Sequence, residues 1–265
     1  MLGTLTHVTD QTDPAINLGL RDRVVLVTGG VRGVGAGISA VFADQGATVL
    51  TCARRPVEGS PYEFLACDVR DDDAVREMLD DVVARHGRID VVINNAGGSP
   101  YAAAAEASAN FSRKIIELNL IGPLQVAQHA NRHMQTQSRG GSIINICSVS
   151  GRRPTPGTAA YGAAKAGLEN LTSTLAVEWA PRVRVNNIVV GMVETEQSEL
   201  FYGDADSLAQ VAATVPLGRL ARPADIGWAA AYLASDLAGY VSGASIEVHG
   251  GGEPPAYLDA SSANK

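Results

Sequence analysis

With 265 residues, of which 46% are hydrophobic and 18% charged, the chain can bury a sizeable core in one large domain or two small ones, and disorder throughout is excluded. The formal net charge of −7 disfavours nucleic-acid binding, which needs clustered Lys and Arg. No apolar run approaches the ~20 residues of a membrane span, and the first basic residue is Arg21. We therefore expect a soluble cytoplasmic protein without a signal peptide.

Residues 1–19 are polar and threonine-rich and show no periodicity, which predicts a flexible N-terminal arm or, alternatively, an arm that crosses to a neighbouring subunit. From Arg21 onward, short apolar runs alternate with segments whose apolar residues recur at helical spacing. The expected strands are 24–27, 47–52, 64–66, 89–93, 142–147, 183–189 and 245–248. The expected helices are 35–45, 71–86, 111–137, 159–180 and 223–235.

Several of these runs are rich in Val and Ile and apolar on both faces, which is typical of parallel strands covered by helices on each side. The alternation predicts an α/β fold, a Rossmann-like doubly wound parallel sheet of about seven strands with helices on both faces. No linker or repeat divides residues 20–252, so we expect one dinucleotide-binding and catalytic domain there. Residues 253–265, with Pro254 and Pro255, are expected to leave the core as a C-terminal tail.

A glycine-rich loop follows the first expected strand, with the sequence TGGVRGVG at 28–35, and opens into a helix. Glycines permit a tight turn and a close approach of the backbone to a pyrophosphate, and the helix N-terminus offers free N–H groups to the anion. A simple turn is the alternative, but the position after the first strand favours dinucleotide binding. The expected contacts are Gly29, Val31, Arg32, Gly33 and Val34.

The second expected strand is followed by Arg54 and Arg55, where a carboxylate would bind the adenosine ribose of NAD. With Arg32 in the loop, three guanidinium groups can converge on a 2′-phosphate, which favours NADP over NAD. A solvated basic corner is the alternative. Asp68, after the third strand, can accept a hydrogen bond from the adenine amino group. The sequence NNAG at 94–97 ends the fourth strand, where such sheets open a ligand crevice.

Tyr161 and Lys165 are four residues apart on an expected helix, so their side chains share one face. We expect the ammonium, together with an oxidised nicotinamide, to lower the pKa of the tyrosine from its ordinary value of about 10. Chance occurrence of this spacing is common. Ser148, at the end of the fifth strand, favours a catalytic site, because its hydroxyl and that of Tyr161 can reach one substrate carbonyl. Asn119 can hold a water beside Lys165.

On these residues the chain resembles the short-chain dehydrogenase/reductase family, in its single-domain branch, over about residues 20–252. The resemblance implies that Tyr161 is the general acid/base, that Lys165 lowers its pKa and binds the nicotinamide ribose, that Ser148 holds the substrate oxygen and that Asn119 anchors a relay water. It places NADP(H) against the loop glycines and, further along, the following residues: Arg54, Arg55, Asp68, Val69, Asn95, Ala96, Gly97, Tyr161, Lys165, Val193 and Thr195. The chain departs from the family pattern at Val190, where proline is usual, and at His249, where Asp is frequent.

The variable segments 98–105, 152–158 and 192–216 are expected to line the substrate pocket, the last with a lid helix around 207–215. Their apolar residues favour a hydrophobic carbonyl or secondary alcohol. Arg152 and Arg153 can instead meet an anionic carrier, so a 3-oxoacyl-thioester reductase acting on acyl carrier protein or CoA is the alternative; a solvated turn is the simpler interpretation of the two arginines. A non-catalytic NADP-binding regulator is a third possibility, disfavoured by the complete set of reacting groups.

Three cysteines, Cys52, Cys67 and Cys147, lie far apart in apolar stretches, so we expect buried thiols rather than a disulfide framework or a zinc site. His129 and His133 are spaced to share a metal, but without a third ligand a polar helix face is favoured and no metal is expected.

The family resemblance also implies packing of the helices at 111–137 and 159–180 against their copies. Covering an apolar edge strand at 245–252 by a second interface then gives a D2 homotetramer, with a dimer as the alternative.

Overall fold

The computed structural model describes residues 17–262, so most of the expected N-terminal arm lies outside the described residues. Within them, seven parallel strands form one sheet in the order β3-β2-β1-β4-β5-β6-β7. Each strand lies within two residues of its expected bounds. The strands are β1 Val24–Thr28, β2 Thr48–Ala53, β3 Glu63–Ala66, β4 Val91–Asn94, β5 Gly141–Ser148, β6 Val183–Val190 and β7 Ser245–Val248.

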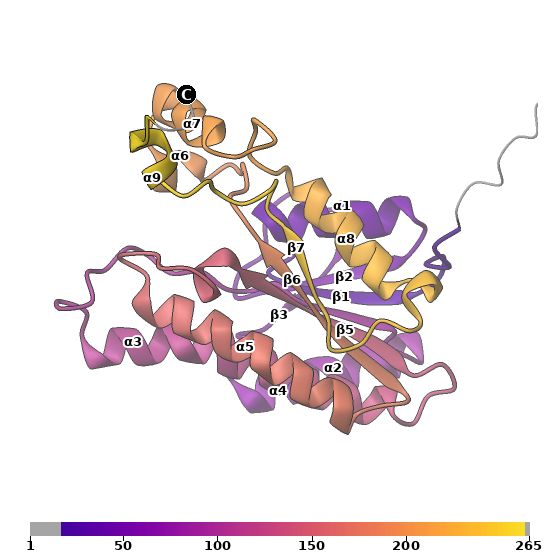
Figure 1. The fold of residues 1–265 in the computed structure, drawn as a ribbon. Helices are drawn as coiled ribbons and strands as arrows, with labels where there is room; N and C mark the ends of the chain where they lie inside the picture. The colour runs from indigo at the N-terminus through magenta and orange to yellow at the C-terminus, as the bar shows by residue number, and fades with distance from the viewer. Residues whose placement is uncertain (1–16, 263–265) are drawn as a thin grey trace, which may run out of the picture.

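Helices cover both faces of the sheet, as Figure 1 shows, and confirm the doubly wound α/β fold. One apolar layer packs helices α1 Gly33–Asp44 and α8 Pro223–Ala234 against the sheet. The other packs α2 Asp72–His86, α4 Gly122–Met134 and α5 Ala159–Glu178. The remaining helical segments are α3 Ala109–Ile116, α6 Ser198–Tyr202, α7 Ala205–Ala213, α9 Tyr257–Ala260 and the short turns Val149–Gly151 (η2) and Asp236–Ala238 (η3).

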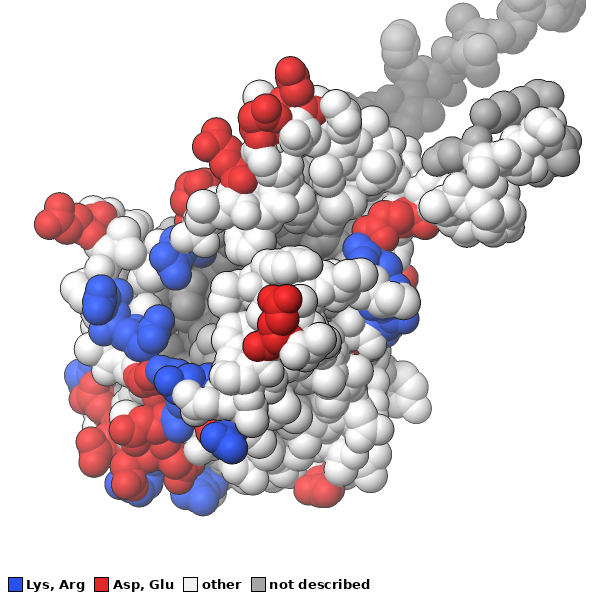
Figure 2. All heavy atoms as spheres, turned by 90° about the vertical axis from the view of Figure 1, so that its left-hand side faces the viewer, with Lys and Arg blue, Asp and Glu red and all other residues white. Residues whose placement is uncertain are grey.

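Helices α6, α7 and α9 form a part that stands apart from the sheet at the top of Figure 1. Figure 2 shows that the surface is hollowed below this part. Because α6 and α7 follow the carboxyl end of β6, the hollow lies at the edge where parallel strands end, which is where open α/β sheets bind ligands. Helix α7 corresponds to the lid helix expected around 207–215 and starts two residues earlier.

The long helix expected over 111–137 is interrupted. A π-helical turn, η1 Glu117–Ile121, separates α3 from α4 and holds Asn119 fully buried at its centre. Pro123 at the start of α4 lacks the N–H group that a continuous helix would use there. Apolar periodicity cannot detect such a turn, because it adds only one residue to the helical repeat.

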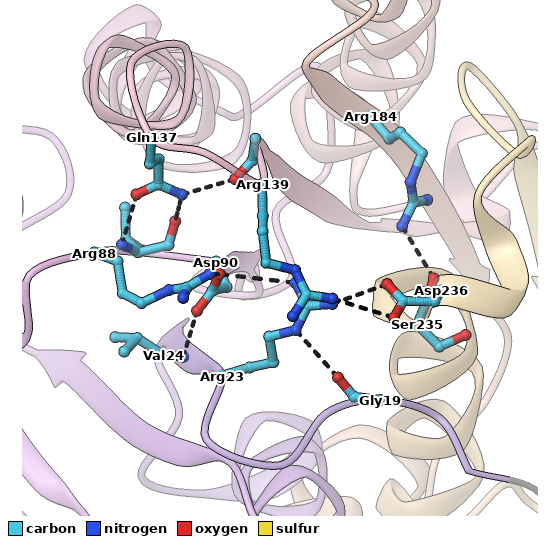
Figure 3. Close-up of polar contacts among 12 residues, drawn as sticks. Gly19, Arg23, Val24, Arg88, Asp90, Gln137, Arg139, Arg184, Ser235 and Asp236 are labelled. Carbon is cyan, nitrogen blue, oxygen red and sulfur yellow. Dashed lines mark hydrogen bonds and ion pairs between the residues drawn. The ribbon is translucent and has the colours of Figure 1, made fainter.

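The amino end of the sheet is held by a buried carboxylate, Asp90, shown in Figure 3. Its Oδ2 accepts a hydrogen bond from the Val24 backbone N–H at 2.9 Å, and its Oδ1 pairs with Arg88 and, at 3.7 Å, with Arg23. Arg23 also donates to Asp236 at 2.9 Å. Three segments far apart in sequence are therefore joined at the edge opposite the hollow.

Removing this carboxylate leaves the Val24 backbone N–H without its partner and takes one ion pair each from Arg88 and Arg23, although Arg23 keeps Asp236. We expect Asp90→Ala to lower the free energy of unfolding, measured in urea, by about 3–5 kcal/mol, the cost of breaking a buried ion pair. Asp81→Ala is the matched control: Asp81 pairs with Arg85 at 2.8 Å on the exposed face of α2, and its loss should cost less than about 1 kcal/mol. Equal losses in the two variants would contradict the assignment.

Candidate active site

Two elements bring three of the predicted residues to the hollow edge of the sheet. Ser148 is the last residue of β5, and Tyr161 and Lys165 lie on the first turns of α5. Lys165 is 3% exposed, and its ammonium donates to the backbone carbonyl of Ile146 at 2.7 Å. Its Nζ lies 5.6 Å from the centroid of the Tyr161 ring. Helix α5 is therefore fixed to β5 just before Ser148, and the tyrosine and serine hydroxyls share one site.

Asn119 joins the same site from the π-helical turn. Its Oδ1 accepts from the Gly98 N–H at 2.8 Å, and its Nδ2 donates to the Gly98 carbonyl at 3.0 Å and to the Ile115 carbonyl at 2.9 Å. A Cβ added at Gly97 would lie 2.6 Å from Asn119 Oδ1 and 3.4 Å from Lys165 Nζ. Only a glycine therefore lets the end of β4 approach Asn119 and Lys165 so closely.

Burial dominates the electrostatics of Tyr161 in the nucleotide-free chain. Burial raises the pKa of Tyr161 above its ordinary value, and a hydrogen bond with Ser148 lowers it by less. Burial also lowers the pKa of Lys165. Without nucleotide, desolvation of the phenolate therefore outweighs the contact with Ser148, and the lowering expected from the ammonium together with an oxidised nicotinamide stays a prediction.

The glycine loop turns tightly against the start of α1. Gly29 and Gly33 have φ of +63° and +52°, and a Cβ at Gly35 would lie 2.3 Å from the Gly29 carbonyl oxygen. Asn95 fixes this turn, since its Nδ2 donates to the carbonyls of Thr28 and Gly29 at 2.9 and 3.2 Å. The Thr28 hydroxyl in turn accepts from the N–H groups of Asn95 and Ala96, both at 3.0 Å. The structure thus brings the two predicted cofactor segments together.

The three predicted arginines, Arg32, Arg54 and Arg55, are exposed, and no ion pair engages them within residues 17–262. Arg54 lies close enough to Asp68 to lower the pKa of that carboxyl, although the larger effect comes from Arg70, which hydrogen-bonds it through Nε at 2.9 Å. Asp68 is therefore already engaged by a neighbour two residues away. Val69 is buried beside Gly122.

The segment after β6 returns to the glycine loop. Thr195 approaches Gly33, with 3.6 Å between its Cγ2 and the position of a Cβ on that glycine, and Val193 forms a parallel bridge with Ala221. Although valine replaces the usual proline before Gly191, the backbone continues its pairing with β7, since the Gly191 N–H donates to Val248 at 3.1 Å. His249 contacts Gly191 and pairs with Glu247, which fits a structural role.

Two histidines outside the candidate active site contact aspartates of a neighbouring helix. His129 and His133 each bind an aspartate of α2, Asp72 and Asp80, at 2.8 Å, which joins α4 to α2.

Over the described part of the chain, no group of three or more His, Cys, Asp or Glu can hold a metal ion. All three cysteines are buried and free, as expected. No helix within residues 17–262 has the length and apolar character to cross a membrane.

Tyr202 is a further side chain near Tyr161, and no pattern in the sequence predicted this position. Its phenol lies in the electrostatic neighbourhood of Tyr161 and hydrogen-bonds the backbone of Val193. Arg152 and Arg153 are both committed to carboxylates: Arg152 to Glu169 and Glu247, Arg153 to Glu253. Local sequence gave no signal for these contacts, because the partners lie 17 to 100 residues away.

Residues 29–253 match a family model described as enoyl-(acyl carrier protein) reductase. The chain is 37% identical over 243 residues to the cis-4-hydroxycyclohexanecarboxylate dehydrogenase of Sinomonas cyclohexanicum, which covers 87% of this chain and 96% of that protein. It is 35% identical over 244 residues to the 3-oxoacyl-acyl-carrier-protein reductase FabG of Thermotoga maritima, covering 88% and 98%.

Among solved structures, the aldohexose dehydrogenase of Thermoplasma acidophilum superposes with a TM-score of 0.85 at 30% identity, covering 93% of this chain and 98% of that one. These proteins act as dehydrogenases and reductases by name, and their likeness extends over nearly the whole chain. The chain therefore belongs to the short-chain dehydrogenase/reductase family.

Proposed function

We propose that this oxidoreductase is NADP(H)-dependent and transfers hydride between the nicotinamide and a carbonyl or secondary-alcohol carbon of a hydrophobic substrate, with Tyr161 as the general acid/base. The observation that carries the proposal is the convergence of Ser148, Tyr161, Lys165 and Asn119 at the carboxyl ends of β4 and β5. Family membership already gives an oxidoreductase that acts on CH–OH or C=O groups and uses NAD or NADP.

Each of the four side chains has one task in this proposal. Tyr161 donates a proton to the substrate oxygen during reduction and removes it during oxidation, while Ser148 holds the same oxygen by a hydrogen bond. Lys165 keeps a positive charge beside the tyrosine, and Asn119 orders the backbone of Gly98 next to them. Bound NADP(H) supplies or accepts the hydride, while the protein positions the reactants and excludes water.

The residues of the glycine loop fit a dinucleotide phosphate. The turn at Gly29 and Gly35 leaves no room for a Cβ, so the backbone itself can approach an anion at the start of α1. Arg32, Arg54 and Arg55 are exposed and have no ion-pair partner among residues 17–262, so their guanidinium groups could meet a 2′-phosphate, and no carboxylate stands at the end of β2 to bind a ribose hydroxyl. These features support NADP over NAD.

Apolar and aromatic side chains of the 192–216 segment, among them Met192, Val193, Phe201 and Tyr202, support a hydrophobic substrate. A second candidate is reduction of a 3-oxoacyl thioester, which the likeness to FabG favours. Against it, Arg152 and Arg153 already pair with carboxylates and offer little to an anionic carrier. NADPH oxidation against a panel of ketones, aldehydes and acyl thioesters separates these candidates, and binding of NADPH without turnover of any of them would indicate a regulator.

Tyr161→Phe keeps the ring and removes the proton carrier. We expect kcat to fall by at least ~100-fold, the lower end of general acid–base effects, while NADPH affinity measured by fluorescence titration changes little. Turnover close to that of the wild type would refute the assignment of Tyr161.

The pH at which Tyr161 ionises follows from its burial. Because burial raises the pKa of Tyr161, the phenol stays protonated through neutral pH in the nucleotide-free protein. The difference in phenolate ultraviolet absorbance between wild type and Tyr161→Phe should therefore develop only above the ordinary tyrosine value of about 10. A difference that develops near neutrality in the absence of nucleotide would contradict this prediction.

Arg54→Asp places a carboxylate where the 2′-phosphate is expected. Since charge-assisted hydrogen bonds contribute roughly 1.5–3 kcal/mol, the preference for NADP(H) in kcat/KM should fall by about ten-fold or more. Arg76→Asp provides a control, because Arg76 lies on α2 and pairs with Asp73. A wild type that already prefers NADH would show the cofactor proposal to be wrong.

We propose a homotetramer as the assembly. Val177 and Ile121 are 80% and 39% exposed on helices α5 and η1–α4, and Trp228 is 50% exposed on α8, which contacts the edge strand β7. Burial of two such surfaces across two-fold axes gives D2 symmetry. Light scattering should then give about four times the chain mass of 27.5 kDa; a dimer would remove one interface, and a monodisperse monomer at micromolar concentration would exclude both.

A further inference from the structure

An arginine–glutamate pair joins the loop that follows Ser148 to the segment that follows β7. Arg153 Nη2 donates to Glu253 Oε1 at 2.6 Å, and the two side chains are 38% and 28% exposed. Arg153 Nη1 donates to the Thr155 hydroxyl at 3.0 Å and to the Pro154 carbonyl at 3.3 Å. Both Nη atoms are therefore already engaged, and the positive charge of Arg153 is matched by the Glu253 carboxylate.

Two observations place this pair next to the reacting groups. The Arg153 backbone N–H bonds the Val149 carbonyl at 2.9 Å, so the loop that carries it folds back onto the residue after Ser148. Burial is the main cause that raises the pKa of Tyr202, and Arg153 and Glu253 act on it more weakly and with opposite sign, so both charges lie within electrostatic reach of that phenol. A substrate that extends from Ser148 and Tyr161 toward Tyr202 would therefore approach the ion pair.

Glu253 reaches Arg153 along a defined backbone path. The three preceding residues, Gly250 to Gly252, have φ between +66° and +99°, which favours glycine at each position. Gly250 accepts a hydrogen bond from the Leu217 N–H at 3.1 Å, and Gly251 packs against Pro216. The segment is therefore anchored on the end of the lid before Glu253 turns to the arginine.

The lid adds charge of the same sign as Glu253. Residues 194–217 contain five acidic side chains and no Lys or Arg. Of these, Glu199, Asp204 and Asp206 are exposed on or beside α6 and α7, and Figure 2 shows acidic side chains along the top of the face that carries the hollow. A carboxylate on a substrate that lay near Arg153 would meet an arginine that is already paired, below a lid that carries acidic side chains.

We propose that Glu253 masks Arg153 and so makes the site selective for uncharged carbonyl and alcohol substrates over those that carry a carboxylate. This inference rests on the proposed function, because it concerns the same site. A carboxylate near Arg153 would have to displace Glu253 or remain without a partner, and either event costs free energy that a neutral substrate does not spend. Selectivity of this kind comes from a repulsive element as much as from an attractive one.

The test compares two ketones of the same ring that differ in charge, 4-methylcyclohexanone and 4-oxocyclohexanecarboxylate, with NADPH. The measured quantity is the ratio of kcat/KM for the carboxylate ketone to kcat/KM for the neutral one. The wild type should favour the neutral ketone by at least about ten-fold. Glu253→Gln frees the guanidinium and should raise the ratio at least about ten-fold, the size expected of one charge-assisted hydrogen bond.

The double variant Arg153→Gln/Glu253→Gln should lose this gain, because the cation that would bind the carboxylate is absent. Glu247→Gln is the matched control: it removes one of the two carboxylate partners of the neighbouring Arg152, which keeps Glu169, and should leave the ratio unchanged. NADPH affinity should be the same in all variants. A ratio that Glu253→Gln does not raise, or a gain that persists in the double variant, overturns the inference while turnover of the neutral ketone keeps the proposed function intact. Loss of all ketone turnover in the wild type would overturn both.

Discussion

The hydrogen bond from the buried Lys165 ammonium to the Ile146 carbonyl, 2.7 Å long, determines where the reacting groups meet. A buried charge needs hydrogen-bond partners, and this one finds its partner in the backbone of β5 two residues before Ser148. Helix α5 is thereby held in one register against the strand. Tyr161, one turn earlier on the same face, then faces the serine. Any shift of α5 along β5 would separate the two hydroxyls on which the proposed chemistry depends.

The two edges of the sheet are held by different kinds of contact. At the amino edge, charged side chains around Asp90 join β1, β4 and the turn after α8, and the contribution is to stability. At the carboxyl edge, the close contacts are made by backbone and small residues: Gly35 against Gly29, and Gly97 against Asn119. The carboxyl edge is thus shaped mainly by backbone and small residues, and within residues 17–262 no ion pair engages Arg32, Arg54 or Arg55.

Patterns in the sequence predicted the fold and the proximity of Ser148, Tyr161 and Lys165. Apolar runs located all seven strands, because parallel strands covered on both faces need them, and the four-residue spacing of Tyr161 and Lys165 holds on α5. The π-helical turn around Asn119 could not be seen, since it changes the helical period by one residue only. The direction of the Tyr161 pKa shift was also beyond the sequence, because it depends on how deeply the phenol is buried.

Long-range pairs were likewise hidden from sequence reasoning. Arg153 and Glu253 are 100 residues apart, and nothing local in either segment announces their contact. Arg152 and Arg153 therefore stayed open to two interpretations, a solvated turn or, less favoured, a contact with an anionic carrier, whereas the fold pairs both with carboxylates. By contrast, Arg54 and Arg55 have no such partner within residues 17–262. Their contact with a nucleotide phosphate therefore stays a prediction.

We propose that hydride passes directly between NADPH and a carbonyl carbon in this site. The most direct measurement uses NADPH that carries deuterium at both C4 positions, with 4-methylcyclohexanone as the acceptor and mass spectrometry of the alcohol product. The account predicts that one deuterium appears on the carbinol carbon of each product molecule. An alcohol without deuterium, or NADPH that binds while no alcohol forms from any carbonyl of the panel, would contradict it.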